Sequence, residues 1–274
     1  MKRAGAPCGV PALFMPALLE AVHLTKKFGG LTAVRDFSLK LAGGELWGLI
    51  GPNGAGKTTV FNMLTGILQP DGGEIYVNGE NLTRAPPWRF TKAGVARTFQ
   101  NLRLLWDRTV EENLLFALSA FLPYNLGDCC FYRTKYFQIE SKAKERIAVT
   151  MQECGLAEYK DVPILDLPYG VQRKVEIARA LLLSPKLLLL DEPTAGIHPN
   201  EIPSILTLLQ SVWENHKITM IVIEHNMRVI MSLAQHIIVM CEGQIIAQGP
   251  PVQIQNDPEV IRIYLGERYV ARQG

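Results

Sequence analysis

Residues 51–59 read Gly51-Pro-Asn-Gly-Ala-Gly-Lys-Thr-Thr59, which fits the phosphate-loop pattern G-x-x-x-x-G-K-[ST]. The mostly apolar residues 45–50 come directly before the loop and predict a buried strand. Apolar residues then recur at helical spacing and predict a helix behind the loop: Val60, Met63, Leu64, Ile67 and Leu68. A strand, a glycine-rich loop and a helix in this order favour a polyphosphate site over a simple connecting turn.

The loop contains the groups that a polyphosphate needs. Its glycines let the backbone bend so that successive N–H groups point inward, and the start of the helix adds further N–H groups and the positive end of its dipole. Lys57 would bring a positive charge to the β- and γ-phosphates, and the Thr58 hydroxyl is a ligand for Mg²⁺. We expect the whole loop to bind nucleotide: Gly51, Pro52, Asn53, Gly54, Ala55, Gly56, Lys57, Thr58 and Thr59.

The composition is that of an ordinary globular protein. A chain of 274 residues with 48% hydrophobic and 20% charged residues suits one α/β domain that carries a subdomain. The net charge of +2 is too small to argue for nucleic acid as a partner. Five cysteines without metal-ligand spacing are typical of reduced thiols in a cytoplasmic protein. No apolar run approaches the ~20 residues that span a bilayer. If the protein works at a membrane, we therefore expect another subunit to recruit it.

Two further apolar runs end in polar residues. Residues 187–190 lead into Asp191 and Glu192, and residues 218–223 lead into Glu224 and His225. Short, fully apolar runs bounded by turn signals are typical of buried parallel strands. Asp191 is placed to hold Mg²⁺, and Glu192 to act as the general base that polarises an attacking water. Either carboxylate alone could simply cap the turn that follows it. Such capping explains poorly why two carboxylates stand together beside a phosphate loop.

The chain divides by composition into two regions. Residues 15–85 and 165–274 carry the strand and turn signals of a nucleotide-binding core, while about 86–164 is rich in helix formers and predicts an inserted helical subdomain. Residues 250–274 predict a short helical tail, and residues 1–14 a disordered extension. Phe28 lies shortly before the phosphate loop, where its ring could stack on an adenine base or simply pack against the loop.

Five motifs in one order resemble the nucleotide-binding subunits of ATP-binding-cassette (ABC) transporters. They are the phosphate loop, a glutamine loop at Gln100, a signature at residues 167–172, the Asp191-Glu192 strand end and His225. The resemblance covers almost the whole chain from Met15. It implies an α/β fold of the P-loop NTPase type, with an antiparallel β subdomain and an inserted helical subdomain that carries the signature.

The resemblance also implies roles for single residues. His225 would contact the γ-phosphate and keep Glu192 in register, and Gln100 would sense Mg²⁺ and the γ-phosphate. The implied catalytic residues are Glu192, His225, Lys57 and Gln100, and the implied metal ligands are Thr58, Gln100 and Asp191. In the family, two subunits pack head to tail around two ATP molecules. The signature would bind the partner's ATP through Pro168, Tyr169, Gly170 and Gln172.

Two positions depart from the family pattern. Pro168 stands where the signature usually has serine, and His198 stands where many relatives have aspartate. One lost hydrogen bond to a charged group is worth about 1.5–3 kcal/mol. We therefore expect a weakened ATP site rather than an abolished one.

Details of the signature and of residues 260–267 look like the branched-chain amino-acid importers, and specifically the longer of their two ATPase subunits. That resemblance implies a peripheral subunit on the cytoplasmic face of the inner membrane. It would bind permease subunits and a second ATP-binding subunit, act indirectly with a solute-binding protein, and bind no nucleic acid. The alternatives are the ATPase of a urea or short-chain amide importer, the ATPase of lipopolysaccharide export, and a regulatory module that hydrolyses nothing.

Overall fold

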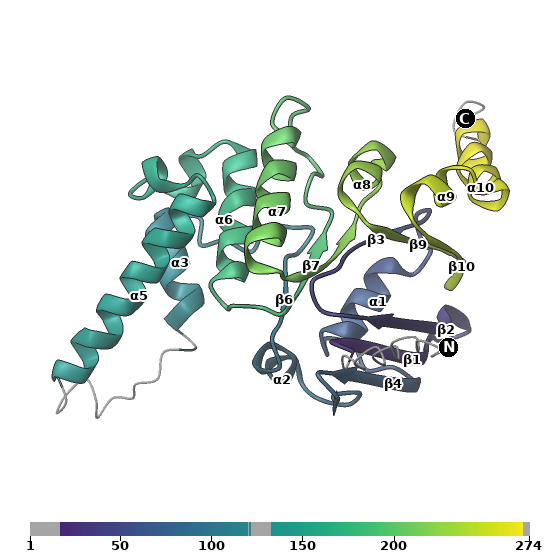
Figure 1. Ribbon diagram of the computed structural model, residues 1–274, viewed down its shortest axis with the longest axis horizontal. Coiled ribbons are helices and arrows are strands. Elements are labelled where there is room, and N and C mark those ends of the chain that lie inside the picture. Colours follow the sequence, from purple (N-terminus) through teal and green to yellow (C-terminus); the bar gives the residue numbers. More distant parts are fainter. Residues whose placement is uncertain (1–16, 120, 122–132, 271–274) are drawn as a thin grey trace, which may run out of the picture.

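A four-stranded antiparallel sheet holds the N-terminal part of the chain. The computed structural model describes residues 17–119, 121 and 133–270 (Figure 1). The strand order in this sheet is β2-β1-β4-β5, and the predicted antiparallel subdomain is thus confirmed. Its strands are β1 (Leu19–Phe28), β2 (Leu31–Leu41), β4 (Gly72–Val77) and β5 (Glu80–Asn81).

A six-stranded sheet in the order β10-β9-β3-β8-β7-β6 forms the centre of the molecule. Its neighbours pair in parallel except for the terminal β9–β10 hairpin. Its strands are β3 (Leu46–Ile50), β6 (Val95–Arg97), β7 (Leu187–Asp191), β8 (Thr219–Ile223), β9 (His236–Cys241) and β10 (Gln244–Gly249).

The continuous apolar strands of this sheet are buried on both faces. Leu187 and Leu189 of β7 pack in one apolar cluster with α1 and the antiparallel sheet. Leu188 and Leu190, which point to the opposite face, pack in a second cluster with the helices of the signature region. Burial on both faces explains why these strands read as unbroken apolar runs instead of alternating patterns.

The helices cover the faces and ends of the two sheets. In Figure 1, α3, α5 and α6 gather at one end of the molecule, and α9 and α10 lie at the other, next to β10. The α-helices are α1 (Lys57–Leu64), α2 (Pro87–Lys92), α3 (Val110–Ser119), α5 (Arg133–Glu153), α6 (Tyr169–Leu181), α7 (Ile202–His216), α8 (Met227–Leu233), α9 (Pro251–Gln255) and α10 (Pro258–Val270). Two single 3₁₀ turns, η1 (Ala157–Tyr159) and η2 (Ile164–Asp166), precede α6.

Three details differ from the sequence prediction. Strand β6 was not predicted; it lies inside the range assigned to the helical subdomain but pairs with β7 of the central sheet. The signature sequence predicts a helix that begins near Val171, whereas helix α6 begins at Tyr169, directly after Pro168. The tail forms two helices because Pro258 starts a new helix after a break at residues 256–257.

Residues 1–14, predicted to be a disordered extension, lie outside the described residues. Among the helices that the structure describes, none has the length and apolar composition needed to cross a bilayer.

Candidate nucleotide-binding site

The functional loops meet at one edge of the central sheet. Strands β3, β8, β7 and β6 are parallel neighbours in that order, so their carboxyl ends lie side by side. The phosphate loop follows β3, His225 follows β8, Glu192 follows β7 and Gln100 follows β6. Ligands of open α/β sheets bind outside these carboxyl ends. Strand order therefore brings together residues that lie far apart in the sequence.

The phosphate loop needs glycine at its bends. Gly51 has a φ of 151°, and a Cβ atom there would lie 2.1 Å from the carbonyl oxygen of Met240. Gly56 has a φ of 97°, and its Cβ would lie 2.4 Å from the carbonyl oxygen of Ala33. Lys57 begins α1, and its Nζ donates to the carbonyl oxygens of Gly51 at 2.6 Å and Pro52 at 2.9 Å. The loop thus wraps closely around the lysine that begins the first helical turn.

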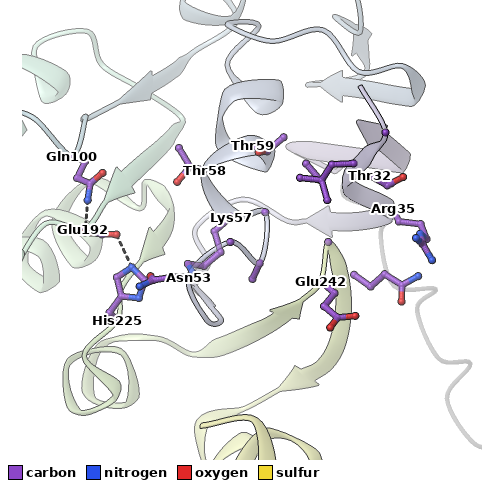
Figure 2. A pocket seen from close by; sticks show the side chains of 18 residues that line it. Thr32, Arg35, Asn53, Lys57, Thr58, Thr59, Gln100, Glu192, His225 and Glu242 are labelled. Atoms are coloured by element: carbon purple, nitrogen blue, oxygen red, sulfur yellow. Dashed lines mark hydrogen bonds and ion pairs between the residues drawn. The ribbon is translucent and has the colours of Figure 1, made fainter. Parts of the chain in front are cut away.

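A cavity of about 730 Å³ opens over this loop. That volume is in the range of small-molecule sites. Figure 2 shows Lys57, Thr58, Gln100, Glu192 and His225 around the pocket. Its lining consists of residues 30–33, Arg35, residues 53–59, Gln100, Glu192, His225 and residues 242–244.

The wall opposite the predicted catalytic residues was not itself predicted from the sequence. It comes from the start of β2 and from the turn between β9 and β10, and Figure 2 shows Thr32, Arg35 and Glu242 there. The backbone N–H of Arg35 donates to the carbonyl oxygen of Gly243 at 2.8 Å, which joins the two sheets at this wall. Contacts between distant turns leave no local sequence pattern, so no motif could have indicated them.

Two neighbouring side chains hold the Glu192 carboxylate. Its Oε1 lies 2.6 Å from Nε2 of His225, and its Oε2 accepts a hydrogen bond of 3.0 Å from the Gln100 amide (Figure 2). Glu192 has a φ of 51°, in the left-handed region that non-glycine residues rarely adopt. Such strain concentrates at functional sites, where the surrounding structure fixes it. The structure thus brings together three of the four predicted catalytic residues by direct contact, and Lys57 lines the same cavity.

Asp191 is buried beside this group rather than exposed in the cavity lining. Its side chain is 4% exposed, and its Oδ2 lies 2.7 Å from Nη2 of Arg97. Nη1 of Arg97 donates to Oδ1 of Asn62 on α1 at 2.7 Å. Sequence reasoning assigned no role to Arg97. The only sequence feature that could have indicated a role for Arg97 was its charge, three positions before Gln100.

The glutamine loop is tied to the signature helix. Arg173 is fully buried and donates to the carbonyl oxygens of Phe99 at 2.9 Å and Gln100 at 3.1 Å. Its Nη1 also lies 2.7 Å from Oε2 of Glu176, whose Oε1 accepts from the N–H of Phe99 at 3.0 Å. Burial raises the pKa of Glu176, opposed by the Phe99 N–H and by Arg173. Movement of the signature helix would therefore move the Gln100 segment.

The predicted signature residues are not among the described residues that line this protomer's own cavity. Gln172 is buried, and its amide donates to the carbonyl oxygens of Ile164 at 3.1 Å and Leu167 at 2.9 Å. Both of its N–H groups are thus used within the chain. Nucleotide contact by Pro168, Tyr169, Gly170 and Gln172 stays a prediction.

Phe28 likewise lies outside the cavity lining within the described part of the chain. Its side chain is half exposed at the end of β1, and Nζ of Lys26 lies 5.8 Å from its ring centre. Adenine stacking on Phe28 therefore stays a prediction as well.

The donor set fits a magnesium ion that arrives with a nucleotide. Within residues 17–119, 121 and 133–270, no cluster of three or more His, Cys, Asp or Glu side chains could hold a metal ion alone. Mg²⁺ is usually bound by one or two carboxylates together with substrate phosphates and water. Thr58 at the cavity and Asp191 at the end of β7 match that pattern.

Comparison with known proteins agrees with this geometry. Residues 34–195 match the family model described as ABC transporter, and residues 244–270 match the one described as branched-chain amino acid ATP-binding cassette transporter. The chain is 42% identical to the branched-chain amino acid transport ATP-binding protein BraF of Pseudomonas aeruginosa, over 91% of this chain and 98% of BraF. It is 41% identical to LivG of Escherichia coli, with the same coverage.

Solved structures agree too. The ADP conformation of MJ1267, an ATP-binding cassette of an ABC transporter, superposes with a TM-score of 0.78 at 30% identity. The match covers 92% of this chain and 99% of that one, and confirms the predicted fold class. A family match over more than half of the sequence and close relatives along nearly its full length point to one conclusion. The chain belongs to the ABC transporter family, as an ATP-binding subunit that couples ATP hydrolysis to transport.

Proposed function

We propose that this subunit hydrolyses magnesium-bound ATP to drive the uptake of branched-chain amino acids through separate permease subunits. The solute assignment is supported by the names of BraF and LivG and by the match of residues 244–270 to the branched-chain amino acid family model. Substrate choice itself would lie in the membrane and solute-binding proteins.

The arrangement around Glu192 is the observation that carries the proposed mechanism. Glu192 would accept a proton from the attacking water, while His225 and Gln100 hold its carboxylate in one orientation. Lys57 would exchange its bonds to the loop carbonyls for bonds to the β- and γ-phosphates. Bound Mg²⁺, held by Thr58 and Asp191 and sensed by Gln100, would neutralise charge on the phosphate oxygens.

The location of the signature supports a two-subunit site. Tyr169 and Gly170 begin α6, where helix N–H groups suit an anion, but in the described part of the chain they do not line the cavity over the phosphate loop of the same protomer. We propose that a second ATP-binding subunit, identical or a shorter sister, supplies its signature to complete each site. The pair would sit against the permeases at the cytoplasmic face of the inner membrane.

Substitution of Glu192 by Gln tests the mechanism. The variant should lose ATP turnover by at least 100-fold, the usual contribution of a general base, yet still bind ATP and form a more stable dimer. Glu214→Gln, at an exposed position of α7, is the matched control and should keep wild-type turnover. Turnover at the wild-type rate in Glu192→Gln would refute the assignment of the base.

Uptake of radiolabelled leucine tests the solute. A strain that lacks this gene should lose uptake, and the wild-type chain but not Glu192→Gln should restore it. Parental uptake in the deletion strain, together with loss of urea or amide uptake, would assign the subunit to another importer.

A further inference from the structure

We propose that Arg97 is a positioning residue of the ATPase site, which orients the Asp191 carboxylate for the metal ion that accompanies ATP. This inference rests on the proposed roles of Asp191 and Mg²⁺. Within the described ranges, Arg97 is not among the residues that line the cavity, so its effect would act through Asp191.

The Arg97 guanidinium joins three functional segments. Nη2 lies 2.7 Å from Oδ2 of Asp191 at the end of β7, and Nη1 donates to Oδ1 of Asn62 at 2.7 Å. Asn62 belongs to α1, the helix that starts at Lys57 of the phosphate loop. Arg97 itself ends β6, three residues before Gln100. One side chain therefore fixes the spacing between the phosphate-loop helix, the proposed metal ligand and the glutamine loop.

The surroundings select arginine over lysine. The guanidinium carbon lies 5.5 Å from the ring centre of Phe61 and 5.1 Å from that of Phe99. Aromatic faces favour the planar guanidinium, and its fork reaches two acceptors at once. A lysine ammonium would keep the charge at Asp191 but would lose the second, directional bond.

Stability alone explains this arginine poorly. Its side chain is 6% exposed, and in the described part of the chain its Nε has no hydrogen-bond partner. An unpaired buried N–H costs free energy, and a buried ion pair often contributes little net stability. The arrangement is instead well suited to hold one carboxylate in one orientation.

The contact between Arg97 and Asp191 determines which carboxylate oxygen of Asp191 could serve a metal ion. Arg97 engages Oδ2 of Asp191, so Oδ1 would be the oxygen that serves a bound Mg²⁺. Residues that orient a metal ligand typically change metal affinity by about 10–100-fold. The positive charge of Arg97 opposes this effect because it repels a cation. We expect the orientation of Asp191 to outweigh this repulsion, so removal of Arg97 should weaken the response of nucleotide binding to Mg²⁺.

The role of Arg97 can be tested by equilibrium binding of a fluorescent ATP analogue to the full chain. Binding is measured over a range of Mg²⁺ concentrations. In Arg97→Gln the Mg²⁺ concentration at half-maximal binding should rise about tenfold, while binding in EDTA stays unchanged. Arg97→Lys should show a smaller rise. Arg89→Gln, which removes an exposed arginine paired with Glu80, is the matched control and should behave as wild type.

Two further variants separate positioning from folding. The double variant with Arg97→Gln and Asp191→Asn should have the same Mg²⁺ midpoint as Asp191→Asn alone, because the effects of coupled residues are not additive. Asn62→Ala keeps the ion pair but removes the other anchor, and should raise the Mg²⁺ midpoint by a smaller factor. An unchanged midpoint in Arg97→Gln and Asn62→Ala, or full additivity with Asp191→Asn, would overturn the proposal. If binding of the ATP analogue to the wild type does not depend on Mg²⁺, the proposed role of Asp191 as a metal ligand is itself wrong.

Discussion

Nε2 of His225 lies 2.6 Å from Oε1 of Glu192, although the two residues are 33 positions apart. The contact exists because β7 and β8 are parallel neighbours, so the residues that follow them meet at one edge of the sheet. Gln100 reaches the other carboxylate oxygen from the end of β6, the next strand along. The Glu192 carboxylate is thus held from both sides by residues of separate loops.

Replacement of His225 by Ala should lower ATP turnover about 100-fold, because a misplaced catalytic group costs a factor of that size. ATP binding should change little, since the phosphate loop remains intact. Steady-state turnover and equilibrium nucleotide binding measure the two effects. His216→Ala is the control, because that histidine also pairs with a glutamate, Glu153 at 3.3 Å, but on α7. Equal effects of the two substitutions would contradict a specific role for His225.

Sequence reasoning found the residues that follow recognisable local patterns. Lys57 lies in a loop motif, and Glu192 and His225 follow apolar strands whose type could be predicted. Arg97 was missed because its partner Asp191 is 94 positions away. Strand β6, with three residues, is too short to show a period. Long-range pairing, which decides both features, leaves no trace in a single sequence.

Replacement of Gln172 by Leu should lower the free energy of unfolding by about 1–3 kcal/mol, the cost of leaving a buried polar group unpaired. The amide braces the turn before α6 through the carbonyls of Ile164 and Leu167. Urea denaturation measures the loss, and Gln210→Leu on the exposed side of α7 should show little. Unchanged stability combined with weaker ATP binding would favour a direct nucleotide contact instead.

Replacement of Pro168 by Ser should raise kcat/KM for ATP roughly tenfold or more, if the partner's phosphates reach this residue. Pro168 occupies the N-cap of α6 and has neither a hydroxyl nor an N–H to offer. A hydroxyl that bonds a charged group adds about 1.5–3 kcal/mol. Pro168→Ala relieves the same backbone restraint without the hydroxyl and should show no such gain. An equal gain in both variants would assign the effect to the backbone.

Cys154 should make the protein less stable at alkaline pH. Burial raises the pKa of its thiol to about 12, from an ordinary value of 9.0, because the buried thiolate would lose its hydration. The folded state therefore holds the proton more tightly than the unfolded state, so this stability is present below pH 9 and is lost as the pH rises toward 12. At pH 10 the loss amounts to about 1.4 kcal/mol.

Denaturation of wild type and Cys154→Ala between pH 8 and pH 10 measures this loss. Other titrating groups are common to both proteins and cancel in the difference between them. The stability of wild type relative to the variant should fall by about 1.4 kcal/mol over this range. Parallel pH profiles would show that the Cys154 thiol titrates alike in the folded and unfolded chains, contrary to its burial at 2% exposure.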